Sequence, residues 1–413
     1  MKKTVIVIGL LVFSATVLTF CTKKNQVLDS SSTTPTILNA QKGTATLQPI
    51  GGAAWDGTIE SVWANAPRLT VHAVVPDLGN NTFTGFVGNA TDVTIRSLYD
   101  ADNIYMLVEW NADQKNVASS PWYYNTATRK WAQEAGAPVL NADNTTFRPA
   151  FIQDQFVVIF NIANSCPTFK TQSCYATCHA NSSFGGTIAP DGGGMRTNGP
   201  TEFLDCWRAR MLQVVNVNQA NDAYLDWGNG TLNQNEVHND AMANTTDGGF
   251  SNKQSLTVKG LTTKASVPMW VIPAGGYSNG AIMLGDTVSG KAIKVVGVDS
   301  NGVLTLANAA TIDPRTAASG NIYQQVGNGD GANCIPGSIV SNYSGSRGDV
   351  TANAYWTGSG WRLLLKRALK TTDAATDIDF SALADQPFGM GVMFNGADNE
   401  HAIVNGLTLH FNQ

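Results

Sequence analysis

Alternating apolar and polar residues predict β-strands along most of the chain. Residues 92–110 form two alternating runs joined by the turn-forming sequence Asp100-Ala101-Asp102-Asn103, which predicts a β-hairpin. A β-branched run of strand length at residues 155–162 leads directly into a cysteine-rich segment. Near the C-terminus we predict a hairpin over residues 355–367 and two further strands at 389–394 and 406–411. Only residues 203–213 have a pattern that favours a helix.

The middle of the chain carries a second group of short strand-like runs. They lie between residues 254 and 310 and are separated by Gly-Gly, Ser-Asn-Gly and Asp-Ser-Asn-Gly turns. We interpret this group as hairpins inserted into the main sheet, with the insertion extending over about residues 229–325. Short strands with glycine and asparagine turns throughout predict a mainly β fold, an antiparallel β-sandwich with few short helices, rather than an α/β fold.

The N-terminus has the pattern of a bacterial lipoprotein signal. Lys2 and Lys3 precede an apolar run that ends at Phe20 and is followed by Cys21. This pattern predicts cleavage of residues 1–20 and lipidation of Cys21, although Phe20 is bulkier than the small residue usually found there. Cleavage without lipidation and an uncleaved anchor remain alternatives. We therefore expect a protein of the cell envelope, lipid-anchored in the periplasm or at the outer membrane of a Gram-negative bacterium.

A polar segment separates this signal from the rest of the chain. Residues 21–48 are rich in Ser, Thr, Asn and Gln, and we predict that they form a flexible tether. The folded body then begins near Pro49 and extends as one elaborated domain over residues 49–413, because no second linker divides it. With 14% charged residues and a formal net charge of −5, the chain has no basic surface typical of nucleic-acid binding, and we expect no nucleic-acid partner.

The segment from Cys174 to His179 carries the most distinctive chemistry of the chain. The covalent haem signature is C-x-x-C-H, in which two thiols bond the porphyrin and the adjacent histidine binds iron. This chain has C-x-x-x-C-H, with His179 beside Cys178. Iron ligation by His179 is therefore a reasonable hypothesis, whereas attachment through both thiols is less certain. Two alternatives remain open: Cys174 and Cys178 in disulfides, or a zinc site made by them with His179 and Cys206.

The other cysteines allow structural disulfides in an exported protein. Cys206 and Cys334 are far apart in the sequence, so a bridge between them would close a long loop and stabilise the fold. Cys166 competes for either partner, and the pairing stays open at this stage. Because Cys166, Cys174, Cys178, Cys206 and Cys334 are odd in number, at least one thiol remains outside any bridge.

Several motifs, in order along residues 50–413, resemble one known family. Together they are similar to the haem-binding domain related to the γ subunit of ethylbenzene dehydrogenase. The resemblance implies an antiparallel β-sandwich, akin to some carbohydrate-binding modules, that holds one haem and passes electrons to a partner protein. The motifs are Trp55-Asp56-Gly57 with Trp63, the hairpin at residues 98–110, Cys174 to His179, Asp205-Cys206-Trp207, Arg347 to Val350, Trp361 to Leu369, Asp377 to Phe380, and Gly391 to Asn395.

The resemblance also implies axial ligands. In the γ subunits it implies a methionine and a lysine as ligands of a non-covalent haem b, the lysine lying just before the last strand. Here that neighbourhood has no lysine, and His401 is its nearest residue able to bind iron. The methionine segment corresponds to the cysteine-rich stretch with His179. A pair of histidines, His179 and His401, is our simplest hypothesis for a c-type haem if Cys174 and Cys178 are bonded to it, or a b-type haem otherwise. Alternative sixth ligands are Met393, Met211 and Met269, although methionines on apolar strands are usually core residues.

Residues next to Cys206 have side chains suited to a haem pocket. Arg208 and Arg210 follow Trp207, and an arginine near a haem commonly pairs with a propionate carboxylate. We predict cofactor contacts for Arg210 and Trp207, with Tyr175 a plausible ring neighbour. The alternatives are a solvated helix face for the arginines and a sandwich core for Trp207. His72, His238 and His410 are expected to be remote from the iron, with His72 and His410 facing solvent.

Two classes of function follow from these observations. The first is a non-catalytic haem protein that transfers electrons to or from an unidentified redox partner at the cell envelope. The second is a carbohydrate-binding module without haem, which the 10 Trp residues make chemically credible. A hydrolase has little support, because no G-x-S-x-G, H-E-x-x-H or phosphate-binding loop occurs in a suitable context. Asp377 and Asp379 occupy alternating positions, and we interpret them as a solvated sheet face.

Overall fold

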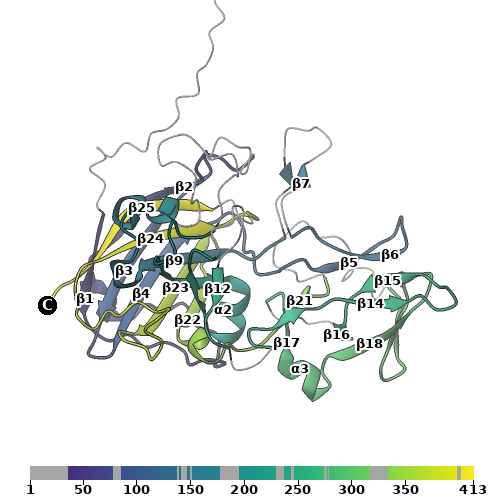
Figure 1. Ribbon diagram of the computed structural model, residues 1–413. Coiled ribbons are helices and arrows are strands. Elements are labelled where there is room, and N and C mark those ends of the chain that lie inside the picture. The colour runs from purple at the N-terminus through teal and green to yellow at the C-terminus, as the bar shows by residue number, and fades with distance from the viewer. Residues whose placement is uncertain are drawn as a thin grey trace, which may run out of the picture.

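A single large sheet forms the main body of the molecule (Figure 1). The computed structural model describes residues 36–77, 85–136, 139–140, 147–148, 151–176, 195–228, 237–242, 246–273, 277, 279–316, 334–397 and 401–413. Within these ranges the sheet order is β12-β11-β10-β9-β24-β25-β1-β3-β4-β23-β22, and β2 pairs with β3 and β25. The strands are β1 (Ile37–Lys42), β2 (Leu69–Val74), β3 (Ala90–Tyr99), β4 (Asn103–Asn111), β9 (Gln155–Asn161), β10 (Leu204–Arg210), β11 (Asn221–Leu225), β12 (Val237–Asn239), β22 (Thr351–Trp356), β23 (Gly360–Ala368), β24 (Gln386–Met393) and β25 (Ala402–Phe411).

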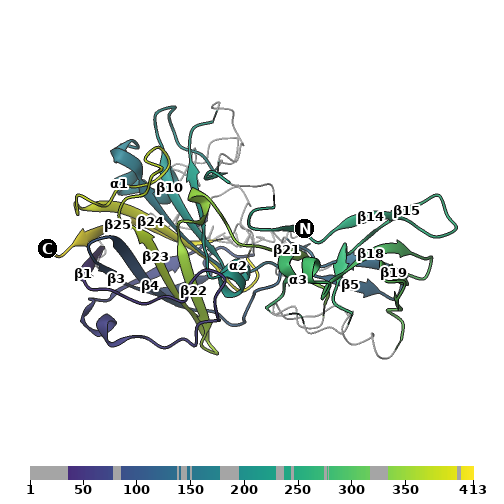
Figure 2. The same ribbon diagram turned by 90° about the horizontal axis from the view of Figure 1, so that it is seen from below.

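The sheet curls so that its two halves face each other across one apolar core (Figure 2). Strands β4 and β9 are far apart in the strand order, yet Trp110 of β4 stacks on Phe156 of β9 with ring centroids 6.1 Å apart. Trp361 of β23 donates its indole N–H to Asp154, just before β9, at 2.8 Å. The described chain is therefore mainly β with a sandwich arrangement, and the fold class predicted from the sequence is confirmed.

The predicted hairpins form where the turn chemistry indicated. Strands β3 and β4 pair antiparallel around Asp100, whose Oδ1 accepts hydrogen bonds from the backbone N–H groups of Asp102 (2.9 Å) and Asn103 (2.8 Å). The Tyr105 hydroxyl donates to Oδ2 at 2.6 Å. Burial opposes ionisation of Asp100, but these hydrogen bonds outweigh it and lower its pKa to about 2. Strands β22 and β23 pair in the same antiparallel way around residues 357–359.

The beginning of the folded body differs from the prediction. We expected a tether over residues 21–48, but Ile37–Lys42 form strand β1, which lies parallel to β25 on one side and to β3 on the other. Its signal is short: only Leu38 and Ala40 point into the core, between polar Asn39 and Gln41. Two apolar positions in a polar stretch gave too weak an alternation to be recognised. The preceding signal segment and Cys21 lie outside the described residues.

The predicted helix at residues 203–213 is also wrong. Leu204–Arg210 is strand β10, and a helix, α2 (Met211–Val217), begins only after it. Strand β10 is buried on both faces, with Trp207 and Ala209 in the main core and Leu204 and Cys206 packed on the opposite side. Burial on both faces fills the intervening positions and hides the period of two that identifies a strand. The other helices are short: η1 (Ser61–Asn65), η2 (Ile162–Asn164), α1 (Phe169–Gln172), η3 (Ser173–Ala176), α3 (Leu284–Ser289) and η4 (Ser346–Gly348).

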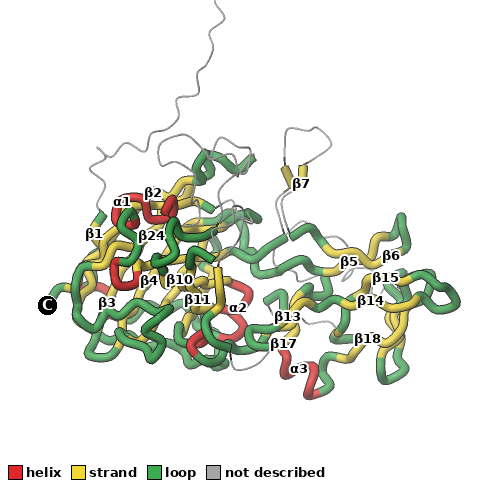
Figure 3. Tube along the Cα trace, in the orientation of Figure 1, coloured by secondary structure: helices red, strands yellow, loops and turns green. Residues whose placement is uncertain are grey.

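A smaller lobe of short strands projects from the main sheet (Figure 3). Its own core includes Trp122, Trp131, Val271 and Leu304, and α2 packs against it through Leu212 and Val217. Most of its strands fall inside the insertion expected at about 229–325, but β5, β6 and β21 belong to the lobe and lie outside that range. The strands are β5 (Trp122–Asn125), β6 (Lys130–Gln133), β13 (Phe250–Ser251), β14 (Gln254–Thr257), β15 (Lys264–Val267), β16 (Trp270–Val271), β17 (Ile282–Met283), β18 (Ile293–Val298), β19 (Leu304–Leu306), β20 (Thr311–Ile312) and β21 (Ser338–Val340); β7 (Val139–Leu140) and β8 (Phe147–Arg148) form a separate pair.

The long-range disulfide considered for Cys206 and Cys334 is not formed. Both cysteines are buried, in different parts of the molecule: Cys206 packs beside Cys166 and Phe169 on the main sheet, whereas Cys334 precedes the Trp122–Ile335 bridge of the small lobe. Burial and the nearby Glu202 raise the pKa of the Cys166 thiol to about 11. In the described ranges no helix has the length and apolarity needed to span a membrane.

The position of β1 gives a direct test of where the body begins. Leu38 is fully buried in the main core, whereas its neighbour Ile37 is 52% exposed. Leu38→Ala is expected to lower the free energy of unfolding by about 2–5 kcal/mol, because it leaves a cavity between the two halves of the sheet. Ile37→Ala, the matched control, is expected to change it by less than about 0.5 kcal/mol. Urea unfolding followed by tryptophan fluorescence measures both, and equal effects would contradict the placement of β1.

Candidate functional site

Four adjacent strands present a row of chemically distinctive residues on the side of the sheet away from the main core, here called the outer face. Gln155 of β9 pairs with Arg210 of β10 on one side and with Met393 of β24 on the other. Val392 pairs with Ala402, so the preceding residue, His401, lies opposite Met393. Because Phe156, Val392 and Ala402 point into the main core, alternation directs this row outward.

The cysteine-rich segment docks on this outer face. Ser173 Oγ accepts a hydrogen bond from the Gly406 N–H at 3.1 Å, and the Cys174 N–H donates to Asn405 Oδ1 at 3.1 Å. The Cys174 thiol lies 3.6 Å from Nε2 of His401, a residue 227 positions away in the sequence. The structure therefore brings together two residues that we predicted as parts of one site.

Two glycines make this close approach possible. A Cβ on Gly389 would lie 2.8 Å from Cβ of Ser173, and a Cβ on Gly391 would lie 3.1 Å from Cδ2 of His401. Both glycines are on β24, at alternate positions that face outward like Met393. Their missing side chains leave room for the 173–176 turn and for the imidazole ring against the sheet.

His401 differs from the other described histidines in its surroundings. It is only 9% exposed. His72 and His410 are exposed and pair with Asp92 (2.7 Å) and Asp385 (2.6 Å), which confirms that both face solvent. His238 pairs with Asp226 at 3.1 Å.

A group of arginines lies at the other end of the outer-face row. Arg210 is half-buried beside Arg208, and its Nε is buried without a hydrogen-bond partner in the described structure. The positive charge of Arg208, followed by burial, lowers the pKa of Arg210 to about 10. Arg347 adds a further positive charge to the same neighbourhood. Guanidinium groups that repel one another and have a donor to spare favour an anionic ligand.

Other unpaired polar atoms lie on the same face. Gln155 Oε1 and Asn405 Nδ2 are buried without hydrogen-bond partners in the part of the chain that the structure describes. A buried polar atom without a partner is unfavourable by about 1–3 kcal/mol, so such atoms are normally satisfied by ordered water or by a ligand. The outer face thus carries an unsatisfied acceptor, Gln155 Oε1, and an unsatisfied donor, Asn405 Nδ2, in addition to the Arg210 guanidinium.

The remaining residues predicted for the site do not all lie on the outer face. Cys178 and His179 lie outside the described residues, so iron ligation by His179 and the zinc and short-disulfide alternatives stay predictions. Trp207 points into the main core between Phe160 and Phe380, on the opposite side of the sheet from Cys174. Of the alternative methionine ligands, Met211 is in the core and Met269 belongs to the small lobe; Met393 alone shares the outer face.

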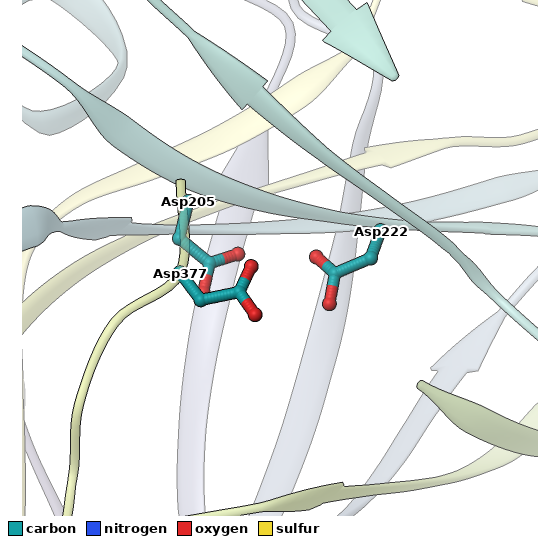
Figure 4. Close-up of side chains that lie close together, drawn as sticks. All are labelled: Asp205, Asp222 and Asp377. Atoms are coloured by element: carbon teal, nitrogen blue, oxygen red, sulfur yellow. The ribbon is translucent and has the colours of Figure 1, made fainter. Parts of the chain in front are cut away.

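A second cluster, inside the core, was missed in the sequence. Arg367 of β23 forms ion pairs with Asp205, Asp222 and Asp377, all on buried positions. Figure 4 shows the side chains of these three aspartates close together. Our interpretation of Asp377 and Asp379 as one solvated face is wrong: Asp377 is 3% exposed and faces Arg367, whereas Asp379 pairs at the surface with Lys370 at 2.9 Å. Residues 376–380 are a loop rather than a strand, so alternate positions do not share a face. The available signal was Asp205, which lies between the apolar residues Leu204 and Cys206.

Comparison with protein families identifies the evolutionary relationship. The model of the ethylbenzene dehydrogenase family matches residues 60–405, most of the chain. The chain belongs to this family. The match includes strands β2 to β24 and the whole outer-face row from Arg210 to His401.

Solved structures give a more distant similarity to this family member. A family 9 carbohydrate-binding module from Caldicellulosiruptor kristjanssonii in complex with glucose is 8% identical, with 91% of this chain and 95% of that chain covered and a TM-score of 0.27. The same type of module in complex with cellotriose is 9% identical, with 91% and 93% coverage and a TM-score of 0.27. No curated protein matches the chain.

The docking of the cysteine-rich segment depends on Ser173. Its hydroxyl lies 3.3 Å from the Phe169 carbonyl and accepts from Gly406, and the side chain is fully buried. Ser173→Ala is expected to lower the free energy of unfolding by about 1–3 kcal/mol, because the Gly406 N–H loses its acceptor. Thr171→Ala in the same segment is the control, since Thr171 is exposed. Chemical denaturation compares the two, and an equally small effect at Ser173 would contradict this anchoring role.

Proposed function

We propose that this member of the ethylbenzene dehydrogenase family binds one haem on the outer face of β10, β9, β24 and β25. The observation that carries the proposal is the contact of 3.6 Å between Cys174 Sγ and His401 Nε2, on a face that also holds Met393 and Arg210. Thiol, imidazole and thioether are the side chains that attach haem or bind its iron. A haem would supply a centre that accepts and releases one electron.

The residues of the chain have distinct roles in this proposal. His401 provides a nitrogen for the iron, and the rigid strand pair β24–β25 holds its ring against Gly391. His179, in the segment that follows Cys174, is the second proposed ligand, with Met393 as the alternative. Cys174 and Cys178 are the candidate points of covalent attachment. Attachment at either one gives a c-type haem, and attachment at neither gives a b-type haem.

The spacing of the row suits a molecule with an apolar ring and an anionic edge. His401 and Arg210 are separated by three interstrand steps, roughly 14 Å between backbones. Arg210 has a buried N–H donor to spare, and Arg208 is its neighbour. These guanidinium groups are the proposed partners of the propionate carboxylates, which they are able to bind through two parallel hydrogen bonds. Trp207 has no role in this contact, because it lies in the main core.

The second function considered, carbohydrate binding, has less support. Sugar-binding faces stack rings of the sugar on exposed aromatic side chains. Among the described residues Trp63, Trp122, Trp207 and Trp361 are all buried, and Tyr355 is the one aromatic residue among the exposed large hydrophobic side chains, at 38% exposure. We therefore favour haem-dependent electron transfer. The proposed role is that of a non-catalytic carrier, anchored at the cell envelope, that exchanges electrons with a redox partner protein.

The haem proposal is tested by visible spectroscopy of the purified full-length protein. The wild type is expected to show a low-spin haem spectrum. His401→Ala and His179→Ala are each expected to abolish it or convert it to high spin, because an imidazole ligand is lost. His72→Ala and His410→Ala are controls, since both histidines are exposed and paired with aspartates. Arg210→Leu is expected to weaken haem retention without changing the spin state.

The outcome also decides the type of haem and the sixth ligand. Extraction with acidified organic solvent removes a b-type haem and leaves a c-type haem on the protein. His401→Met is expected to retain haem and raise its reduction potential. A protein expressed with haem supply but devoid of iron and of haem absorbance would refute the proposal, and an unchanged spectrum in His401→Ala would remove that residue from the iron.

The envelope location is tested separately. Cys21→Ser is expected to prevent lipidation and to move the protein from the membrane fraction to the soluble fraction of the cells, because the body loses its acyl chains. Mass spectrometry of the mature N-terminus measures the modification directly. Membrane association that persists unchanged in Cys21→Ser would contradict lipid anchoring at this residue.

A further inference from the structure

A second group of residues remains unexplained by haem binding: the buried carboxylates around Arg367. Asp205, Asp222, Asp240 and Asp377 are each at most 3% exposed. Arg367 Nη1 lies 2.5 Å from Asp205 Oδ2 and 3.9 Å from both Asp222 Oδ2 and Asp377 Oδ1. The guanidinium thus makes one close ion pair and is too far from the other two carboxylates for hydrogen bonds.

Most oxygens of these carboxyl groups accept no hydrogen bond in the described structure, which is unusual for buried groups. Among the residues that the structure describes, no N–H or hydroxyl group donates to Oδ1 of Asp205, to Oδ2 of Asp222, or to either oxygen of Asp240 and of Asp377. Nearly all buried polar atoms in folded proteins have partners, and an ionised carboxylate buried without one is strongly unfavourable. Four carboxyl groups face a single guanidinium, so their full ionisation would leave the cluster with an excess of negative charge.

Asp240 extends the cluster from a separate position. It follows β12, and its N–H donates to the Asp222 carbonyl at 3.4 Å, which places it beside β11. Its carboxyl group interacts with those of Asp377 and Asp205, and among the described residues neither of its oxygens accepts a hydrogen bond from any donor other than a protonated Asp377. A buried carboxyl group whose neighbours include other carboxyl groups, and which has no further hydrogen-bond donor in the described chain, indicates a ligand that accepts electron pairs.

We propose that Asp205, Asp222, Asp240 and Asp377 bind a divalent cation that prefers oxygen ligands, with Ca²⁺ as the best match. One ligand oxygen from each of Asp205, Asp222 and Asp377 lies within 4.8 Å of the others, and Figure 4 shows their carboxylates pointing toward one another. Ca²⁺ takes about 6–8 oxygen ligands, including carboxylates, in flexible geometry. Carboxylates without nitrogen or sulfur neighbours select against zinc and copper.

The bound cation has a structural role in this proposal. Asp205 is on β10 and Asp222 on β11, whereas Asp377 belongs to the loop that follows β23. The cation would neutralise the repulsion between these carboxylates, and it would thereby hold the loop that contains Asp377 against β10 and β11. Asp349, which lines a pocket of about 590 Å³ together with Arg367 and Thr351, interacts electrostatically with Asp377.

The experiment compares the full-length protein after chelation and after addition of Ca²⁺ alone. Calorimetric titration at pH 7.5 is expected to show one site per chain, and Ca²⁺ is expected to raise the melting temperature in a saturable way. Asp222→Asn and Asp240→Asn are each expected to weaken Ca²⁺ binding about tenfold or more, because each removes one ligand charge. Asp379→Asn is the matched control, since that nearby aspartate is at the surface.

The main alternative to a bound cation is that the carboxyl groups are protonated and share hydrogen bonds with one another. The sign of the change in unfolding free energy in the variants, with and without Ca²⁺, distinguishes the two. Without Ca²⁺, Asp222→Asn and Asp240→Asn are expected to stabilise the protein by removing repulsion; with saturating Ca²⁺, the same substitutions are expected to make it less stable than the wild type. This reversal supports the proposal. Absence of binding for Ca²⁺, Mg²⁺ and Mn²⁺, with stability that simply rises as the pH is lowered, would overturn it, and so would unchanged affinity in both variants.

Discussion

A guanidinium group, that of Arg367, is buried between the two halves of the sheet, and the surrounding core must stabilise its positive charge. Arg367 is 1% exposed and cannot lose its charge, so the fold must provide anionic and carbonyl partners for it. Asp205 and the Ile378 carbonyl accept its hydrogen bonds, and the rings of Trp207 and Phe380 lie 4.9 and 5.6 Å from it. These contacts fix β23, β10 and the loop after β23 in one arrangement. Removing a partner of such a buried charge is far more damaging than removing an exposed ion pair.

Strand β10 connects this charged core to the outer face. Its residues alternate between the two sides: Asp205 and Trp207 contact Arg367, whereas Cys206 and Arg210 face outward. The register of β10 against β9 is therefore constrained from both faces at once, because a slip of one residue would turn Asp205 out of the core and Arg210 into it. The core cluster in this way secures the position of a residue proposed to meet the cofactor.

The sequence predicted those parts of the molecule whose information is local. The turn at Asp100 and the glycine turn before Trp361 are specified by their own side chains, and both hairpins are confirmed. Strand β10 was mistaken for a helix because burial on both faces removed its alternation, and β1 was missed because only Leu38 and Ala40 carry its pattern. His401 was selected through family resemblance, and its contact with Cys174 depends on tertiary structure. The Arg367 cluster joins residues from β10, β11 and β23 and from the segments that follow β12 and β23, which no local pattern reveals.

The placement of β1 has a mechanical consequence. Because β1 lies between β25 and β3 and runs parallel to both, tension that reaches residue 36 pulls the strand along its own axis. The hydrogen bonds on its two edges are then loaded together in shear, whereas an edge strand pulled sideways loses its bonds one after another. A body attached through this strand resists detachment by stretching, and its first structural element distributes the applied force across the centre of the sheet.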